Sequence, residues 1–336
     1  MKIRLGTFNL FQFVEPPYSW YVKKDKFTPQ QWEEKTAWIK KQILKMDCDI
    51  IGLQEVFSKE PLQKLLFDLG FEYFQTVDSA RVQKENNKVY VSTTVAIASK
   101  FPIKSMEEIQ PNITSIKKHE FKGFFNFARI PVKARITLPN KEEVLVYVCH
   151  LKSNRLNEFE YVFTKEDTLK QKKESVQKAL KEGYSEALKQ RLCEASSLFF
   201  DINKSKSTPS ILMCDLNDKE FSLTIDALTN KTYHYDSKKD NYILHDAYNL
   251  YEQKVYNPHP EQKEIKRTAT SYFAGKGNVL DYIFVSNYFN KKNINHKAKI
   301  SSYEIFDEHL QKNQNGSLLQ SDHAPVVCEI TFTNSC

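Results

Sequence analysis

The chain has 336 residues, with 49 Lys and Arg against 42 Asp and Glu, and a formal net charge of +7 at pH 7. Hydrophobic residues make up 40% of it and charged residues 27%, so the composition excludes wholesale disorder and collagen-like or low-complexity structure. No apolar stretch approaches the ~18 residues of a membrane span, and neither glycine-rich phosphate-binding motif of dinucleotide-binding and P-loop proteins is present.

Met1–Asn9 reads as a strand and lacks the apolar core and cleavage site of a signal peptide. We therefore expect a cytoplasmic monomer, although specialised secretion would leave no N-terminal signal. The cysteines show no metal-ligand spacing, and several lie in apolar runs, as expected of reduced core thiols. They are Cys48, Cys149, Cys193, Cys214, Cys328 and Cys336.

Strands and helices alternate through the first third of the chain. Pro29–Met46 has apolar residues at helical spacing, and Thr28 is suited to be its N-cap. A second helix is expected at Lys59–Leu69, where Gly70 would end it. The strands expected here are Lys2–Asn9, Asp49–Glu55 and Phe71–Thr76.

The rest of the chain carries further strands around one long polar segment. Glu166–Ile202 predicts a helix, or a helix pair broken near Gly183, with lysines on a solvated face, and Lys231–Arg267 reads as a loop region. The expected strands are Thr93–Ser99, Asn126–Ile136, Val144–His150, Ser210–Asp215, Val279–Ser286 and Ala324–Phe332. Because neither a repeat nor a linker divides it, the sequence predicts one α/β domain over residues 1–336.

Polar side chains that could take part in catalysis or metal binding occur at the ends of the predicted strands. Those that follow strands are Asn9, Glu55, His150, Asp215 and Asn217, and those that precede strands are Asp281, Asp322 and His323. In a mixed sheet, the carboxyl end of one strand and the amino end of an antiparallel neighbour lie at the same edge. We therefore expect these groups to converge on one rim, where connecting loops commonly build sites.

The set is rich in hard oxygen donors and includes neither a thiolate set nor the H-E-x-x-H zinc motif. Such donors suit Mg²⁺, with Mn²⁺ as a substitute. A divalent ion beside histidines and a carboxylate base favours phosphoester hydrolysis, because that reaction needs charge neutralisation, a positioned water and a stabilised leaving oxygen.

Eight motifs resemble, in order, those of the endonuclease/exonuclease/phosphatase superfamily of Mg²⁺-dependent phosphoesterases. They are Thr7–Leu10, Ile50–Val56, Val95–Ile103, Arg129–Val132, Cys149–Ser153, Cys214–Asp218, Leu280–Ser286 and Ser321–Val326. The resemblance implies a DNase I-like four-layer α/β sandwich, in which two packed mixed β-sheets are flanked by helices. The motif at His150–Ser153 is more similar to that of bacterial nuclease-like members and sphingomyelinases than to that of abasic-site endonucleases, which have Tyr at this point.

The resemblance also implies ligands for the metal and a base for the reaction. Glu55 would be the principal Mg²⁺ ligand, helped by Asn9 and Asp322. Asp215 would orient or deprotonate the attacking water, and Asn217 would hydrogen-bond the phosphate. The sequence places no further acidic residue close behind Asn9, so a second metal is not expected.

The remaining matched residues are implied to act on the phosphoryl group. His323, held by Asp281, would stabilise the developing charge, and His150 would bind phosphate or assist protonation of the leaving group. Arg129 and Lys152 would contact the substrate.

A plainer interpretation exists for each of these residues. Carboxylates at strand ends often cap turns, histidines are often satisfied core residues, and Asp218 is as suited to cap a helix beginning near Phe221 as to bind metal. We favour the site, because eight motifs occur in order. The other histidines have no motif around them and are expected at the surface: His119, His234, His245, His259, His296 and His309.

The reaction class does not identify the substrate. The leading hypothesis is a phosphodiesterase acting on nucleic acid or a nucleotide-like ester. It is supported by the net positive charge and by basic residues around Tyr272–Phe273, namely Lys263, Lys266, Arg267 and Lys276. A phosphatase or sphingomyelinase-like phospholipase of the same fold is one alternative, and a non-catalytic binding protein is another.

Two aromatic segments bear on that choice. Phe121–Phe127 reads as a buried strand rather than a hairpin that enters membranes. Phe13–Tyr21 directly follows the first strand, so we expect it to line the site and to influence specificity.

Overall fold

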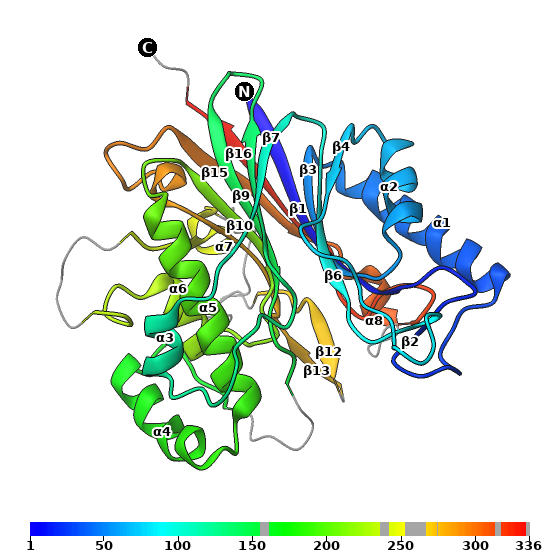
Figure 1. The fold of residues 1–336 in the computed structure, drawn as a ribbon. Helices are drawn as coiled ribbons and strands as arrows, with labels where there is room; N and C mark the ends of the chain where they lie inside the picture. Colours follow the sequence, from blue (N-terminus) through cyan, green and yellow to red (C-terminus); the bar gives the residue numbers. More distant parts are fainter. Residues whose placement is uncertain (155–160, 236–241, 253–266, 274, 313–316, 334–336) are drawn as a thin grey trace.

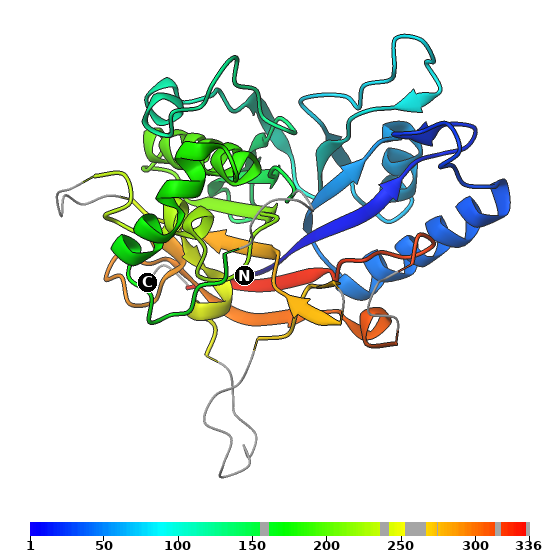
Figure 2. The same ribbon diagram turned by 90° about the horizontal axis from the view of Figure 1, so that it is seen from below.

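Two six-stranded β-sheets form the centre of the computed structural model (Figure 1). The structure describes residues 1–154, 161–235, 242–252, 267–273, 275–312 and 317–333. Viewed from below, helix α1 (Pro29–Met46) lies on one side of the molecule and the helices of residues 169–229 lie on the other (Figure 2). The expected four-layer sandwich is therefore confirmed.

The first sheet combines both ends of the chain. Its strand order is β15 (Ala298–Ile305), β16 (Val326–Phe332), β1 (Lys2–Phe13), β3 (Ile50–Val56), β6 (Thr94–Ser99) and β4 (Tyr73–Gln75). The helices α1, α2 (Lys59–Phe67) and α8 (Glu308–Lys312) belong to this half of the molecule (Figure 1).

The second sheet is built from the middle of the chain. Its strand order is β11 (His245–Asp246), β14 (Asp281–Val285), β10 (Ser210–Asp215), β9 (Glu143–His150), β8 (Val132–Thr137) and β7 (Ile103–Glu108). The helices of this half are α3 (Ile113–Lys118), α4 (Leu169–Glu182), α5 (Glu186–Lys204), α6 (Leu223–Thr229) and α7 (Ala247–Leu250). Two short pairs are added, β2 (Ser19–Trp20) with β5 (Val89–Tyr90) and β12 (Ser271–Phe273) with β13 (Lys276–Asn278).

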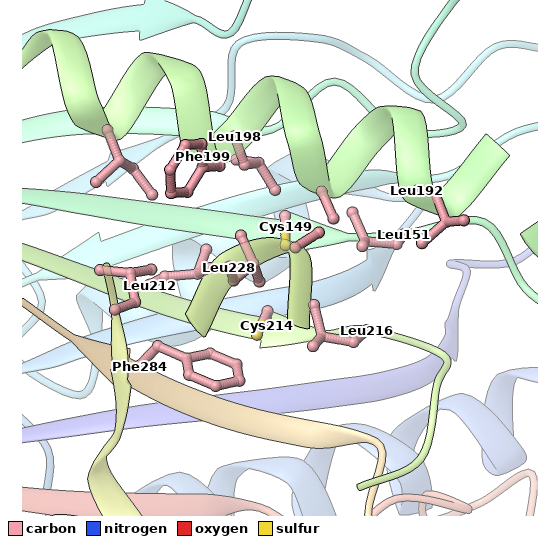
Figure 3. Close-up of a cluster of buried hydrophobic side chains, with 14 of the residues drawn as sticks. Cys149, Leu151, Leu192, Leu198, Phe199, Leu212, Cys214, Leu216, Leu228 and Phe284 are labelled. Carbon is pink, nitrogen blue, oxygen red and sulfur yellow. The ribbon is translucent and has the colours of Figure 1, made fainter. Parts of the chain in front are cut away.

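Apolar side chains fill the space between the sheets and behind each of them. A cluster from both sheets includes Ile50, Val148 and Met213. Behind the second sheet, Leu198 and Phe199 of α5 pack toward Leu212 of β10 (Figure 3). The two sheets are close together at Gly52, where an added Cβ would lie 3.0 Å from Met213 Cβ and 3.1 Å from both Val148 methyl groups.

Local sequence signals account for several element boundaries. Thr28 caps α1 in a capping box with Gln31, and Gly183 ends α4 in the left-handed conformation before α5 begins. The predicted helix pair is therefore confirmed, but its lysines do not all lie in solvent. Lys172 and Lys189 are buried, because they pair with Asp226 and Glu186 respectively.

Three expectations were wrong. Residues 126–130 form a loop, and β8 begins only at Val132. Phe121–Phe127 is not a strand, since Phe125 and Phe127 are buried from a loop and Phe124 is 88% exposed. Within the described part of Lys231–Arg267, β11 and α7 replace the expected loop, and residues 236–241 and 253–266 lie outside the described residues.

The strand directions bring the expected rim together. In the first sheet β1 and β3 are parallel, and β16 runs antiparallel to β1. In the second sheet β9 and β10 are parallel, and β14 runs antiparallel to β10. The carboxyl ends of four strands and the amino ends of two therefore lie at one edge of the sandwich.

Candidate active site

Asp215 lies at the centre of the rim in the second sheet. The strand register pairs it with His150 of β9 on one side and with Asp281 of β14 on the other. His150 Nε2 is 3.3 Å from Asp215 Oδ2, and both residues are buried. The backbone N–H of Asn217 donates to Asp215 Oδ1 at 2.8 Å. Three neighbouring strands thus present three ionisable side chains to one point.

Two side-chain contacts join this cluster to the first sheet. Asn9 Nδ2 donates to Asp215 Oδ2 at 3.0 Å, and His323 Nδ1 lies 2.8 Å from Asp281 Oδ2. Ser321 ties the two incoming segments, since its hydroxyl donates to Asn9 O at 2.8 Å and accepts from His323 N at 3.0 Å. The site is therefore assembled only when the two sheets pack against each other.

His323 is held as a cation among carboxylates. Burial opposes its charging, but the negative charges of Asp281, Asp215 and Asp322 raise the pKa of His323 well above its usual value. Its Nε2 lies 3.9 Å from Asp215 Oδ2 and 4.0 Å from Asp322 Oδ1. This geometry leaves Nδ1–H bonded to Asp281 and directs a second N–H toward the remaining groups of the site.

His150 is held in the opposite state. Burial, assisted by the positive charges of Arg129 and His323, lowers the pKa of His150 well below its usual value. Its Nδ1 has no hydrogen-bond partner among the described residues. A neutral imidazole next to Asp215 is suited to orient that carboxylate, whereas it is a poor source of a proton at neutral pH.

The pKa of Asp215 lies near neutral pH. Burial raises the pKa of Asp215 to about 7, against the lowering effect of the charge on His323. A carboxylate with such a pKa can accept a proton from water near physiological pH.

Glu55 and Asp322 form the acidic side of the site. Gln12 N donates to Glu55 Oε2 at 2.9 Å, and Asp322 Oδ1 is buried with no hydrogen-bond partner within the described ranges. Burial raises the pKa of Asp322 to about 6; the charge of His323 opposes this change, and Glu55 adds to it. Two carboxylates that repel each other, one with an unpaired oxygen, are a donor set that fits a hard divalent cation.

A second cluster of possible metal ligands also lies in the site. Ligand atoms of Asp215, Asp281 and His323 all lie within 4.8 Å of one another. However, a histidine charged by its two carboxylate neighbours has no lone pair to offer a metal. Glu55 and Asp322 are therefore the better candidates for cation binding.

Four of the nine described non-glycine residues with positive φ lie at the same place. Phe11, Gln12, Glu55 and Asn217 have positive φ values of 49°, 61°, 57° and 50°. Each such value is uncommon for a residue with a side chain and costs of order 1–3 kcal/mol. At Phe11 and Gln12 the strained turn directs backbone N–H groups to Asn9 Oδ1 and Glu55 Oε2. The strain thus serves to aim two of the expected metal ligands.

The expected substrate-binding residues lie beside the cluster. Arg129 Nη1 donates to Leu151 O at 3.0 Å, and Asn217 Nδ2 donates to the same carbonyl at 3.0 Å. Lys152 follows Leu151 directly. The side chains of Arg129 and Asn217 therefore meet at one carbonyl beside Asp215, and Lys152 is the next residue along the chain.

Sequence reasoning missed a layer of residues that support the site. Buried Glu194 of α5 accepts from Ala128 N at 2.7 Å and from Lys152 N at 2.8 Å, so it holds the segments that carry Arg129 and Lys152. Arg191, one turn earlier, donates to Lys152 O at 3.1 Å and pairs with Asp218. The sequence signal that could have revealed these residues is the presence of charged side chains at positions of the predicted helix that its periodicity assigns to the core.

Lys35 of α1 is a second missed residue. Its Nζ donates to Leu318 O at 2.8 Å and to Gln320 O at 2.9 Å, just before Asp322. Burial lowers the pKa of Lys35 to about 7, although the charges of Glu55 and Asp322 act in the opposite sense. Lys35 thus fixes the loop that brings Asp322 and His323 to the site.

Other expectations need correction. Asp218 does not cap the following helix, because Ser222 is its N-cap, and Asp218 instead binds Thr224 and Arg191. The histidines expected at the surface include half-buried ones: the ring of His309 lies 3.2 Å from His323 O, and that of His234 stacks on Phe199.

Fewer of the basic residues expected around Tyr272–Phe273 are available to a substrate than the sequence indicates. Arg267 is buried, ion-paired with Asp246 and Glu220 and packed against three tyrosine rings, so it is committed to the core. Lys263 and Lys266 lie outside the described residues.

The five described core cysteines are free and buried, as expected, and Cys336 lies outside the described residues. Within the described segments, no helix is long and apolar enough to cross a membrane.

Comparison with known proteins identifies relatives of this arrangement. The sequence model of the Endonuclease/Exonuclease/phosphatase family matches residues 6–323. Comparison with curated protein sequences gives no match. The chain is similar to the human Nocturnin catalytic domain, with a TM-score of 0.58 and 17% identity over 99% of this chain and 94% of that one.

Two further solved structures share the fold. A humanized TDP2 from D. rerio gives a TM-score of 0.54 at 11% identity, over 98% of this chain and 99% of that one. The mannosyl-6-phosphatase Bt3783 of Bacteroides thetaiotaomicron gives 0.52 at 15% identity, over 98% of this chain and 100% of that one.

Proposed function

This chain belongs to the endonuclease/exonuclease/phosphatase family of phosphoester hydrolases, and we propose that it is a Mg²⁺-dependent phosphodiesterase that acts on nucleic acid or a nucleotide-like ester. One observation carries the proposal. The Asp215 carboxylate receives the Asn9 amide from one sheet and lies beside His150 of the other, with charged His323 3.9 Å away. This arrangement can hold a water and accept its proton next to a group that stabilises negative charge.

In this proposal Asp215 positions the attacking water and takes its proton. Asn9 and the backbone of Asn217 each donate to one of its oxygens, so the carboxylate is fixed in one orientation. A pKa raised to about 7 by burial is matched to base catalysis at neutral pH. His150, held neutral, lies with its Nε2 3.3 Å from Asp215 Oδ2 and adds to this orientation.

His323 binds the phosphoryl group in its charged form. Asp281 keeps the ring protonated at Nδ1 and turned toward the site, so Nε2–H can donate to a phosphoryl oxygen as charge develops there. The second N–H of the Asn217 amide can do the same, because one of its two is already used on Leu151 O.

Glu55, Asp322 and Asn9 would hold Mg²⁺. The fit rests on the unpaired Asp322 Oδ1, its like-charged neighbour Glu55, and the Asn9 Oδ1 oxygen, which has a second lone pair besides the one used by Phe11 N. When bound, the ion would neutralise charge on the phosphoryl oxygens. Arg129 and Lys152 would bind the substrate's phosphate from the opposite sheet. A guanidinium has five donors, and Arg129 uses one on Leu151 O and one on the Tyr21 hydroxyl.

The proposal is tested with two aryl phosphates and with nucleic acid. Purified protein is incubated with bis-p-nitrophenyl phosphate, p-nitrophenyl phosphate, plasmid DNA and RNA, each in Mg²⁺ and in EDTA. Asp215→Asn and His323→Ala are compared with wild type, and exposed Asp68→Asn is the matched control.

We expect Mg²⁺-dependent cleavage of the diester and of a nucleic acid, lost by 100-fold or more in both site variants and kept in the control. Hydrolysis of the monoester alone would replace the proposal with a phosphatase. Wild-type turnover in Asp215→Asn would reject the site.

A further inference from the structure

Tyr21 stands beside the site without a role in the chemistry described so far. It follows β2, in the segment between β1 and α1, and Figure 1 shows β2 at the same end of the molecule as β12 and β13. Its backbone N–H donates to Tyr90 O at 2.7 Å, and the edge of its ring contacts Phe57, two residues after Glu55. The residue before it, Trp20, is buried against Phe27. The backbone at Tyr21 is thus held in place by its neighbours.

The conformation of Tyr21 is costly and its side chain is only partly buried. Its φ is 58°, in the left-handed region that bulky residues rarely adopt, and 43% of the residue is exposed. Core packing gives no reason for this combination, because an exposed ring adds little apolar burial and a strained backbone subtracts from stability. Strain of this kind is common at functional sites. In the described chain it recurs at four site residues, Phe11, Gln12, Glu55 and Asn217, and at four residues outside the site.

The Tyr21 hydroxyl links the two halves of the site. It hydrogen-bonds with Arg129, whose charge also acts on it, and it lies within electrostatic reach of Glu55. Arg129 precedes β8 of the second sheet, whereas Tyr21 and Glu55 belong to the half built on the first. A partly exposed aromatic side chain therefore interacts with a guanidinium of the other half, within electrostatic reach of a principal candidate metal ligand.

We infer that Tyr21 is a specificity-determining residue that stacks on a planar aromatic group of the substrate, a nucleobase or an equivalent ring, while Arg129 holds the attached phosphate. This inference rests on the proposed phosphodiesterase function and names the chemistry of its substrate. An aromatic face recognises any base without reading its hydrogen bonds, so the selected feature is the presence of a ring rather than its identity.

The test uses two diesters that release the same leaving group. Thymidine 5′-(p-nitrophenyl phosphate) carries a nucleobase, and methyl p-nitrophenyl phosphate does not. The ratio of their kcat/KM values is measured in Mg²⁺ for wild type, Tyr21→Leu and Tyr21→Phe, so that leaving-group effects cancel. Both substitutions keep a Cβ on the same left-handed backbone. Tyr184→Leu, which changes a tyrosine 65% exposed after α4, is the matched control.

We expect Tyr21→Leu to lower the preference for the thymidine ester about tenfold, chiefly through KM, and Tyr21→Phe to retain most of it. Tyr184→Leu should keep the wild-type ratio. An unchanged ratio in Tyr21→Leu, or the same loss on both esters, would overturn the inference.

A wild-type protein that hydrolyses neither ester would overturn the proposed function instead. In that case the inference is tested by measuring the affinity for thymidine 5′-monophosphate in Mg²⁺ by calorimetry, with wild type and Tyr21→Leu. Affinity about tenfold weaker in Tyr21→Leu supports stacking, and equal affinity in the two proteins rejects it.

Discussion

Asn9 and Asp215 are separated by 206 residues, yet Asn9 Nδ2 lies 3.0 Å from Asp215 Oδ2. The first residue lies within β1 of one sheet, just before its irregular stretch between Asn9 and Phe13, and the second ends β10 of the other sheet. The bond is buried, so removing either partner leaves the other without its match in a medium of low polarity. It connects the stability of the sandwich with the orientation of the proposed base.

Asn9→Ala is therefore expected to cost about 1–3 kcal/mol of unfolding free energy, because Asp215 loses its donor from the first sheet. The same change should lower kcat by at least about tenfold, since the carboxylate is no longer held in one orientation. Urea unfolding and diester kinetics measure the two effects. Asn140→Ala, in the exposed turn before β9, is the control, and equal stability of the two variants would contradict the assignment.

Glu194→Gln is expected to weaken substrate binding more than turnover. One carboxylate oxygen becomes an NH₂ group that must face either Ala128 N or Lys152 N, both of which are donors, so one of the two segments must move. We expect KM to rise about tenfold and kcat to change less, because Asp215 and His323 are not touched. Glu182→Gln, at the end of the neighbouring helix α4 and 42% exposed at its side chain, is the control. A KM equal to that of wild type would show that Glu194 does not position Arg129 and Lys152.

Gly52→Ala should destabilise the sandwich by about 1–3 kcal/mol. The added methyl group would lie 3.0–3.1 Å from Met213 Cβ and the Val148 methyls, closer than packed carbons tolerate, so the sheets must separate slightly. Thermal or urea unfolding measures the change. In the Val148→Ala background two of the three near atoms are gone, so the cost of Gly52→Ala should be smaller there. An equal cost in both backgrounds would place the strain elsewhere.

Stability should fall below neutral pH through histidines remote from the site. Burial, with lesser effects of neighbouring charges, lowers the pKa of His119 and of His234 to about 4, from the value of 6.5 expected of an unfolded histidine. Between pH 6.5 and 4 the unfolded state therefore binds more protons than the folded one, and the free energy of unfolding decreases as pH falls. At pH 5 the loss is up to about 2 kcal/mol per histidine.

His234→Phe isolates one of these contributions. Its ring stacks on Phe199 at a centroid distance of 4.1 Å, so phenylalanine keeps the packing and removes the titration. The difference in unfolding free energy between pH 7 and pH 5, measured with urea, should be about 2 kcal/mol smaller than in wild type. The same pH difference in both proteins would show that His234 does not carry this linkage.

Much of the local structure follows from short-range signals. Helix α1 has the bounds expected from its N-cap at Thr28 and the spacing of its apolar residues, and β10 has those expected from its apolar run. These signals act over a few residues, through capping hydrogen bonds and side-chain periodicity. Where they are weak, the expectation failed: Asn126–Ile136 reads as one strand, but its first residues form a loop that places Arg129 next to the site.

The family motifs supplied the residues of the rim but not their states. Asp215, Asp281 and His323 are visible in the sequence as strand-end residues, and nothing local states that His323 is charged while His150 is neutral. That difference comes from which carboxylates and cations surround each ring after two sheets have packed together.

Residue types, their order along the chain and the boundaries of the stronger elements can thus be read from the sequence, because they depend on neighbours a few positions away. The burial of Lys35 and Glu194, the left-handed backbone of Tyr21 and the contact of Tyr21 with Arg129 arise from packing between segments far apart in the chain. Electrostatic and steric effects of this kind depend on distance in space, and the sequence lists only distance along the chain.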